Sequence, residues 1–134
     1  SGNVKYRVTD AQKKLAEAYG VDSRKARTLK VAAAVTISGE KVSVTSIAAN
    51  AFKGMKKLEK VTIGTNVSKI GKNAFSGDSK LKSIQIKSKK LTSVGKGALK
   101  NISAKAVIKV PKSKKKAYTS LLKGKGQKKS VKIK

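Results

Sequence analysis

The stretch Val44–Asn66, VTSIAANAFKGMKKLEKVTIGTN, decides the fold, because related copies of it follow directly. The second copy is Val67–Lys90 (VSKIGKNAFSGDSKLKSIQIKSKK) and the third is Leu91–Pro111 (LTSVGKGALKNISAKAVIKVP). Self-similarity at a period of 23 to 24 residues is typical of a solenoid, in which each repeat buries its apolar face only against its neighbours. The repeats therefore predict a molecule whose main feature is an extended surface for binding.

Apolar residues recur at matching positions of the three copies and define the predicted core. The aligned sets are Ile47, Ile70 and Val94; Phe52, Phe75 and Leu99; Val61, Ile84 and Ile108; and Ile63, Ile86 and Val110. Alternation of apolar and polar residues predicts short strands, joined by single α-helical or 3-10 turns. Gly54 and Gly77 stand where a positive φ is expected, with Asn101 at the same place in the third copy. Asn50 and Asn73 are interpreted as satisfying turn backbone.

The same alternation predicts two ladders of outward-facing side chains. One ladder places Thr45, Ser68 and Thr92 next to Ser46, Lys69 and Ser93. The other places Lys60, Ser83 and Val107 next to Thr62, Gln85 and Lys109. Polar β-branched residues are good strand formers, so a purely structural role is the alternative to an exposed binding ladder.

The residues before the repeats are predicted to form strands. Val4–Thr9 alternates, Leu29–Val31 matches the last strand of an incomplete repeat, and Val35–Ile37 with Val42–Val44 flanks a hairpin turn. Ala11–Tyr19 has the composition of a helix. Its alternation and its place in a solenoid cap favour a strand, which is our interpretation.

The residues after the repeats predict a basic cap. Pro111, the only proline, precedes Lys112–Leu122, and Gly124 follows it, which predicts a helix. The apolar residues at helical spacing are Ala117, Leu121 and Leu122. Ser130–Lys134 alternates and predicts a terminal strand.

The chain is strongly and unevenly basic. Its 34 Lys and Arg residues, of which 31 are Lys, face six acids, for a net charge of +28. Residues 1–66 carry a net charge of +8 and residues 67–134 one of +20. Such a field attracts polyanions and opposes self-association, so a monomer is predicted. The alternative is that the lysines only keep a repetitive sheet soluble and its edges unpaired.

The densest group of lysines is the candidate polyanion patch. It consists of Lys112, Lys114, Lys115, Lys116, Lys123, Lys125, Lys128 and Lys129. Lys suits this role because a mobile point charge needs no fixed geometry. Teichoic acids, acidic glycans and anionic lipid headgroups are the polyanions considered. Specific nucleic-acid recognition is not expected, because all three Arg precede residue 28 and both Phe residues are assigned to the core.

Catalysis is not expected from this sequence. The six acids are scattered without paired spacing: Asp10, Glu17, Asp22, Glu40, Glu59 and Asp78. The chain has no Cys and no His, which excludes disulfides, the usual zinc ligands and the usual general base. Ser-x-x-Lys spacings occur, as chance predicts at this Lys content, without the motifs that accompany them in enzymes. No cofactor or metal is expected, and no apolar run approaches the roughly 18 residues of a membrane span.

The motif I-x-x-x-A-F-x-G-x-x-x-L-x-x-V-x-I, which runs from Ile47 to Ile63, resembles the BspA-type, or treponemal-type, leucine-rich repeat of secreted and surface proteins of bacteria. The resemblance covers about residues 29–134, and the ending VPKSKKKAYTSLLKGKGQKKSVKIK resembles the closing cap of such domains. The third copy departs from the motif, since Leu99 replaces Phe, Asn101 replaces Gly and Lys105 replaces Leu. The resemblance implies a right-handed leucine-rich repeat solenoid, β-rich with short helical or 3-10 turns and a C-terminal capping helix. It carries no catalytic residues.

These observations predict one structural domain. Its N-terminal cap strands are expected at 1–28, its leucine-rich repeats at 29–111 and its basic cap at 112–134. The repeats comprise 44–66, 67–90 and 91–111, with a partial repeat and hairpin at 29–43. The expected function is a non-catalytic protein-interaction or adhesion module, extracellular or on the bacterial cell surface. The alternative is docking of anionic polymers, such as teichoic acid or acidic glycans, through the lysine-rich C-terminal half.

Overall fold

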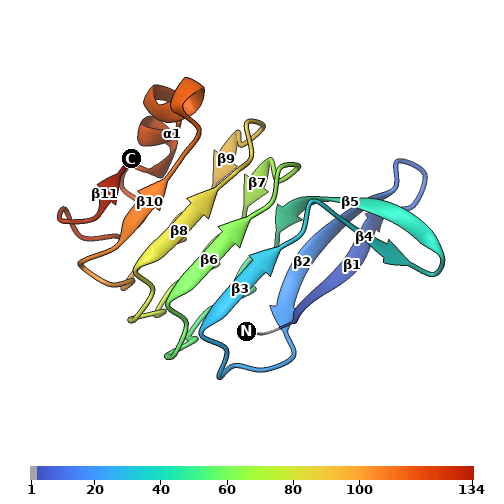
Figure 1. The fold of residues 1–134 in the computed structure, drawn as a ribbon, viewed down its shortest axis with the longest axis horizontal. Helices are drawn as coiled ribbons and strands as arrows, with labels where there is room; N and C mark the ends of the chain where they lie inside the picture. The colour runs from blue at the N-terminus through green and yellow to red at the C-terminus, as the bar shows by residue number, and fades with distance from the viewer. Residues whose placement is uncertain (1–2) are drawn as a thin grey trace.

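The computed structural model describes residues 3–134, which wind into a β-solenoid whose coils stack side by side (Figure 1). Residues 1 and 2, which begin the predicted N-terminal cap, lie outside the described part of the chain. Each repeat contributes one strand to each of two sheets, so apolar side chains from both sheets point into a shared interior. The predicted solenoid fold is confirmed.

One sheet, which we call the parallel sheet, contains only parallel strands. It consists of β3 (Thr28–Val31), β6 (Lys60–Ile63), β8 (Ser83–Ile86), β10 (Val107–Lys109) and β11 (Lys132–Ile133). Its register is regular: Leu29, Val61, Ile84, Ile108 and Ile133 lie side by side. The period of the sequence is therefore the period of the sheet.

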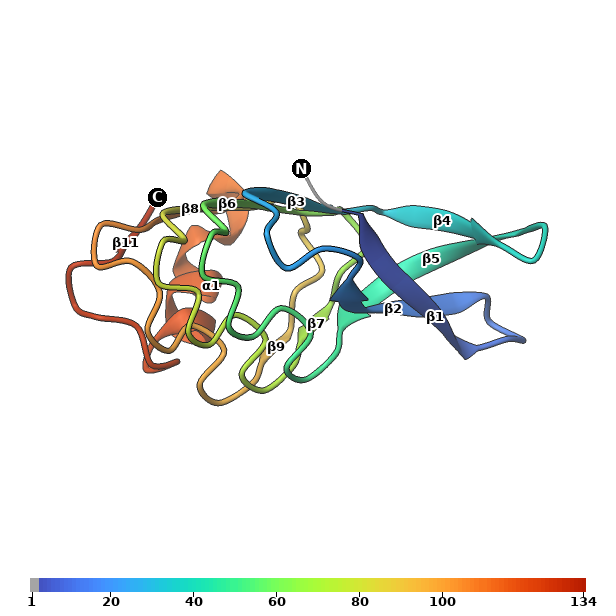
Figure 2. The ribbon, with the colours of Figure 1, turned by 90° about the horizontal axis from the view of Figure 1, so that it is seen from below.

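The other sheet, which we call the mixed sheet, combines parallel coils with two antiparallel hairpins. It contains β1 (Val4–Asp10), β2 (Leu15–Val21), β5 (Glu40–Ile47), β7 (Lys69–Ile70) and β9 (Ser93–Val94) in this order, while β4 (Ala34–Ile37) also pairs with β5. The hairpins β1–β2 and β4–β5 extend beyond the stacked coils at one end of the molecule (Figure 2).

The core lies between the sheets and follows the predicted apolar columns. All twelve aligned residues of the three repeats are buried. Phe52 and Phe75 are fully buried, and their stacked rings have centroids 5.6 Å apart. Leu99 continues this column in the third repeat and is also buried. Lys105, which stands in place of a core Leu, is exposed, and the neighbouring Ala106 is buried instead.

The turns after the mixed-sheet strands depend on left-handed residues. Their backbone N–H groups bond to carbonyls three residues earlier, as from Ala51 to Ala48 and from Lys53 to Asn50. Positive φ recurs at two places: at Asn50 (60°), Asn73 (57°) and Gly97 (73°), and at Gly54 (73°), Gly77 (81°) and Asn101 (59°). Only Gly, and less often Asn, adopts this conformation at low cost. The amides of Asn50 and Asn73 form no hydrogen bond within residues 3–134, so backbone conformation replaces the predicted amide role.

The N-terminal strands follow the prediction except over the ambiguous segment. The strand expected at Ala11–Tyr19 begins only at Leu15, because Ala11–Lys14 forms the hairpin turn. Ala16 and Ala18 are the fully buried residues of this strand, whereas Tyr19 faces outward and is 38% exposed. A helix over this segment is thus excluded by its pairing with β1 and β5.

The C-terminal cap closes the interior beside β9. A 3-10 turn, η1 (Lys112–Lys114), leads into helix α1 (Lys115–Leu122), whose buried residues are Tyr118 and Leu122 rather than the predicted Ala117. The Tyr118 hydroxyl donates to the Ser88 carbonyl at 2.7 Å and accepts from the Leu91 N–H at 3.0 Å. One phenol thereby satisfies two backbone groups of the last loop between repeats.

We expect Tyr118→Phe to lower the free energy of unfolding by about 1–3 kcal/mol, because it leaves a buried carbonyl and a buried N–H without partners. Urea denaturation monitored by circular dichroism measures the change. Tyr19→Phe is the matched control, since its hydroxyl has no partner within the described residues, and its effect should be near zero. Equal effects of the two substitutions would contradict the capping role of Tyr118.

Candidate functional site

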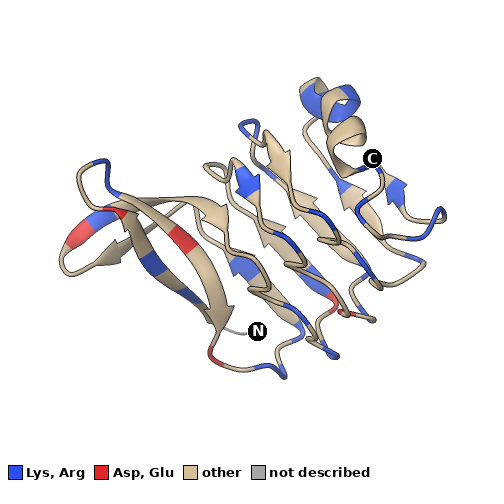
Figure 3. Cartoon of the chain, turned by 180° about the vertical axis from the view of Figure 1, so that it is seen from behind, with Lys and Arg blue, Asp and Glu red and all other residues tan. Residues whose placement is uncertain are grey.

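Charge is distributed unequally along the stack. Residues 60–134 contain 22 Lys and a single acid, Asp78, which is fully buried. The other acids are Glu59 and those on or next to the hairpins. Glu59 lies within 4 Å of Arg27 and Lys82. Figure 3 shows this contrast, with basic residues across the coils and acidic residues mainly on the hairpins. The coils therefore present a positive surface that almost no acidic side chain balances.

The outer face of the parallel sheet assembles the second predicted ladder. Lys60 pairs in register with Ser83 and Val107, and Thr62 pairs with Gln85 and Lys109. Lys30 of β3 extends this row. The polar side chains of the ladder form no hydrogen bond or ion pair within residues 3–134, so they remain available to a partner.

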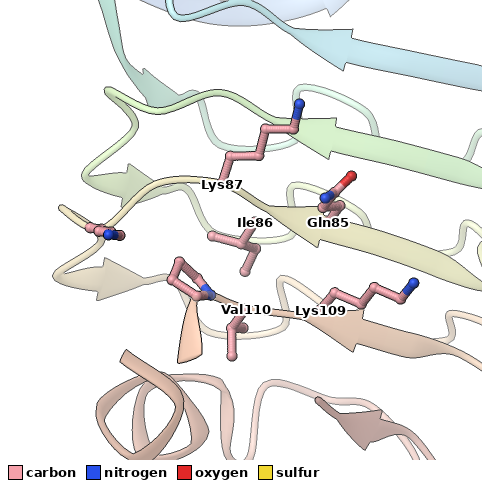
Figure 4. A pocket seen from close by; sticks show the side chains of 7 residues that line it. Gln85, Ile86, Lys87, Lys109 and Val110 are labelled. Atoms are coloured by element: carbon pink, nitrogen blue, oxygen red, sulfur yellow. The ribbon is translucent and has the colours of Figure 1, made fainter. Parts of the chain in front are cut away.

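A shallow hollow lies at one end of this face. It has a volume of about 270 Å³ and is lined by Gln85, Ile86, Lys87, Lys89, Lys109, Val110 and Pro111. Figure 4 shows the side chains of Gln85, Lys87 and Lys109 around it. Strands β8 and β10 and the segment that follows β8 thus place three ammonium groups and one amide around a small, partly apolar depression.

The first predicted ladder divides into structural and free residues. The Ser68 hydroxyl donates to the Thr45 carbonyl at 3.1 Å, and the Thr92 hydroxyl donates to the Ser68 carbonyl at 3.2 Å. These bonds tie one coil to the next. In contrast, Ser46, Lys69 and Ser93 pair in register and line a groove on the mixed sheet.

The predicted lysine patch is only partly a single site. Lys123, Lys128 and Lys129 line one cleft of about 420 Å³, together with Gln127, Val131 and other residues. Gln127 holds this loop by donating to the Leu122 carbonyl at 2.6 Å. The remaining patch residues do not line the cleft: Lys112, Lys114, Lys115 and Lys116 belong to η1 and α1, and the carbonyl of Lys125 accepts from the Leu99 N–H.

Asp78 is a functional candidate that sequence reasoning passed over. Its Oδ1 accepts from the Met55 N–H at 2.7 Å, while Oδ2 has no hydrogen-bond partner among residues 3–134. Burial raises the pKa of this carboxyl to about 8, against the opposing effects of the Met55 bond and of the Arg24 and Lys56 charges. It is therefore largely neutral at pH 7. The signal was present in the sequence, because Asp78 aligns with Met55 and Ile102 in an apolar column.

Stacked two-strand coils with a buried Phe column and a helical cap define a leucine-rich repeat solenoid. The chain belongs to the BspA type leucine rich repeat family, whose model matches residues 33–134 in six copies. The described part of the chain has no helix with the length and apolarity that crossing a bilayer requires.

Solved structures with the same fold come from bacteria. A leucine rich cell surface protein of Faecalibacterium prausnitzii A2-165 is 19% identical with a TM-score of 0.63, over 84% of this chain and 37% of that chain. A leucine-rich repeat protein of Bacteroides ovatus ATCC 8483 is 22% identical with a TM-score of 0.60, over 82% of this chain and 36% of that chain. A T. pallidum leucine rich repeat protein is 16% identical with a TM-score of 0.53, over 81% and 69%. The chain thus spans little more than a third of the first two. No curated protein matches the sequence significantly.

We expect Asp78→Asn to remove a pH dependence of stability. The folded pKa of about 8 lies above the ordinary value of 3.8, so the folded protein holds this proton more tightly than the unfolded chain. The stability it contributes is full below pH 4, falls as the pH rises and is lost once the pH passes 8. The free energy of unfolding should fall by about 3–4 kcal/mol between pH 5 and pH 8 in the parent protein.

Denaturant titrations across this pH range measure the effect. The free energy of unfolding of Asp78→Asn should depend less on pH over this range and should exceed that of the parent protein at pH 8. Glu59→Gln, at a half-buried surface position, should keep the pH dependence of the parent protein. A variant Asp78→Asn with the slope of the parent would show that another group titrates.

Proposed function

We propose that this chain is a non-catalytic protein-interaction module of a secreted or cell-surface protein, and that it serves in adhesion. The observation that carries the proposal is the outer face of the parallel sheet, where a regular ladder of polar and cationic side chains has no partner within residues 3–134. Membership of the BspA type repeat family and the similarity to a cell surface protein support the location.

The chemistry of this face favours a protein partner with an acidic surface. The outward residues of β3, β6, β8, β10 and β11 include Lys30, Lys60, Lys109 and Lys132, and they include no acid. Thr62 and Gln85 supply neutral hydrogen-bonding groups between these charges. Complementary charge would speed association and orient the partner, while the neutral groups would add specificity.

The test is binding to a panel of immobilised extracellular proteins at about 150 mM salt, where long-range attraction is screened. Thr62→Glu/Gln85→Glu places two like charges against an acidic partner and should weaken binding by at least tenfold. Thr9→Glu/Ser120→Glu adds the same charge at exposed positions on β1 and α1, which do not belong to the parallel sheet, and should leave binding nearly unchanged. Binding that tolerates the first variant, or falls equally with both, would contradict the assignment of this face.

A second candidate function is docking of anionic polymers through the lysine-rich C-terminal half. The specific observation in its favour is that the only acid of residues 60–134 is buried, so it cannot offset the surface lysines. The cleft lined by Lys123, Lys128 and Lys129 adds a place where three of these charges converge. A teichoic acid, with its regular phosphates, is the ligand that would use such a cleft.

Neutralising the cap cleft should weaken teichoic acid binding more than neutralising an equal number of distant lysines. The pair of variants is Lys123→Gln/Lys128→Gln/Lys129→Gln against Lys13→Gln/Lys25→Gln/Lys41→Gln, all of them at exposed positions. Binding titrated from about 50 to 500 mM salt should show a shallower salt dependence only for the cap variant. If both variants lose binding equally, the charge acts only in bulk.

A further inference from the structure

The groove on the mixed sheet is a second concave surface, distinct from the ladder face and from the cap cleft. It has a volume of about 410 Å³. One wall is a row of residues in register from four neighbouring strands, namely Glu17, Ser46, Lys69 and Ser93. Adjacent strands lie about 4.8 Å apart, so this row spans about 14 Å along the stack. The groove therefore runs across the strands and suits an extended ligand.

The opposite wall is made of backbone and small residues. A Cβ added at Gly71 would lie 2.4 Å from the Ala49 nitrogen, and one added at Gly95 would lie 2.4 Å from the Lys72 nitrogen. Successive coils thus touch through their backbones at these two glycines, and any larger residue there would push the coils apart. The groove follows from the stacking of the repeats themselves.

The backbone donors beside the groove are already occupied. The N–H groups of Ala48, Gly71 and Gly95 donate to the carbonyls of the preceding coil, each at 2.8 Å. A peptide therefore cannot add to the sheet here as another strand. Recognition has to use side chains, and hydroxyl groups and charges are the side-chain chemistry that the groove offers.

The side chains that face the groove are free. The hydroxyls of Ser46 and Ser93 and the ammonium groups of Lys69 and Lys72 form no hydrogen bond or ion pair within the described residues. The one acid, Glu17, is paired with Arg7. The groove therefore has two uncompensated positive charges, one of which, on Lys69, lies in register between two hydroxyl groups.

An aromatic ring stands near one end. Tyr19 lies two residues after Glu17 on the same side of β2, and in the described part of the chain only Tyr19 and Val8 are exposed large hydrophobic residues. The Arg7 guanidinium lies over one face of the Tyr19 ring, 4.8 Å from the centroid, so a ligand would have to use the other face. A planar apolar surface near hydroxyl and ammonium groups suits a sugar ring, which has an apolar face, better than a polymer that has only polar groups.

We propose that this groove binds a linear acidic polysaccharide, laid along the stack across β2, β5, β7 and β9. Lys69 and Lys72 meet its acidic groups, Ser46 and Ser93 bond to its hydroxyls, and a terminal sugar ring lies on Tyr19. The class of ligand, an anionic polymer, is taken from the proposed function. The new element is the site, which is this groove and not the cleft in the C-terminal cap. Nucleic acid fits less well, because Tyr19 is the only exposed aromatic residue within residues 3–134 and Arg7 is already paired.

The test uses a hyaluronan octasaccharide, in which carboxylates alternate with neutral sugars, in calorimetric titrations at about 150 mM salt. We expect saturable binding that falls about tenfold in Ser46→Ala/Ser93→Ala, which changes no charge, through the loss of two hydrogen bonds. Lys69→Gln should also weaken binding about tenfold, through the loss of a charged contact. Ser79→Ala/Ser113→Ala removes two exposed hydroxyls that form no hydrogen bond within the described residues and lie outside the groove, and it is the matched control, with no expected effect.

Two further probes separate this site from simple charge attraction. A tetraglutamate peptide carries a matching number of side-chain carboxylates, and a neutral chito-oligosaccharide has the matching length; both should bind at least tenfold more weakly. No binding of hyaluronan, or equal binding of either probe, overturns the proposal. Hyaluronan binding that is lost in Lys123→Gln/Lys128→Gln/Lys129→Gln and kept in the groove variants also overturns it, while leaving polymer docking at the cap intact. If no anionic polymer binds, both the groove proposal and the proposal of polymer docking at the cap are wrong.

Discussion

The structure depends on backbone hydrogen bonds that run from each turn to the next coil. Asn50, Phe52 and Gly54 donate their N–H groups to the carbonyls of Lys72, Ala74 and Ser76, at 2.8 to 2.9 Å. The second turn repeats the pattern toward residues 96, 98 and 100, and Leu99 donates to Lys125. Such a ladder forms only if successive turns have the same backbone conformation. This requirement selects Gly or Asn at the two positive-φ positions. It also fixes the spacing between the outward-facing side chains of successive coils.

Identical turns also explain which parts of the structure the sequence predicted. The core columns and the outward ladders follow from period and alternation, because one coil repeats the geometry of the last. The cap helix follows instead from Pro111 before it and Gly124 after it. A contact that breaks the repeat could not be predicted. Tyr118 reaches back from the cap to Ser88 and Leu91, and no other repeat has a counterpart from which to infer this contact. The burial of Asp78 is different, because its alignment with the buried Met55 and Ile102 indicates it.

The candidate sites were predictable to a smaller extent, for the same reason. Alternation gave the members of each ladder but could not separate Ser68, whose hydroxyl bonds to the preceding coil, from Ser46, whose hydroxyl is free. That difference depends on which carbonyl lies within reach across the stack. The sequence predicts the eight lysines of the patch as one site. Only Lys123, Lys128 and Lys129 line a common cleft, and their positions depend on the loop that Gln127 holds.

The positions of the lysines indicate whether their charge serves only to keep the protein soluble and its sheet edges unpaired. Lys132 lies on β11, the last strand of the parallel sheet, where a charged side chain keeps an open edge from pairing with another chain. Lys69 lies on β7, which is bonded to β5 on one side and β9 on the other, so edge protection cannot explain it. Its neighbours in register are two serines, and the nearest acid of the row is neutralised by Arg7. A positive charge kept on an interior strand, among free hydroxyls, is more consistent with recognition of an anion than with solubility alone.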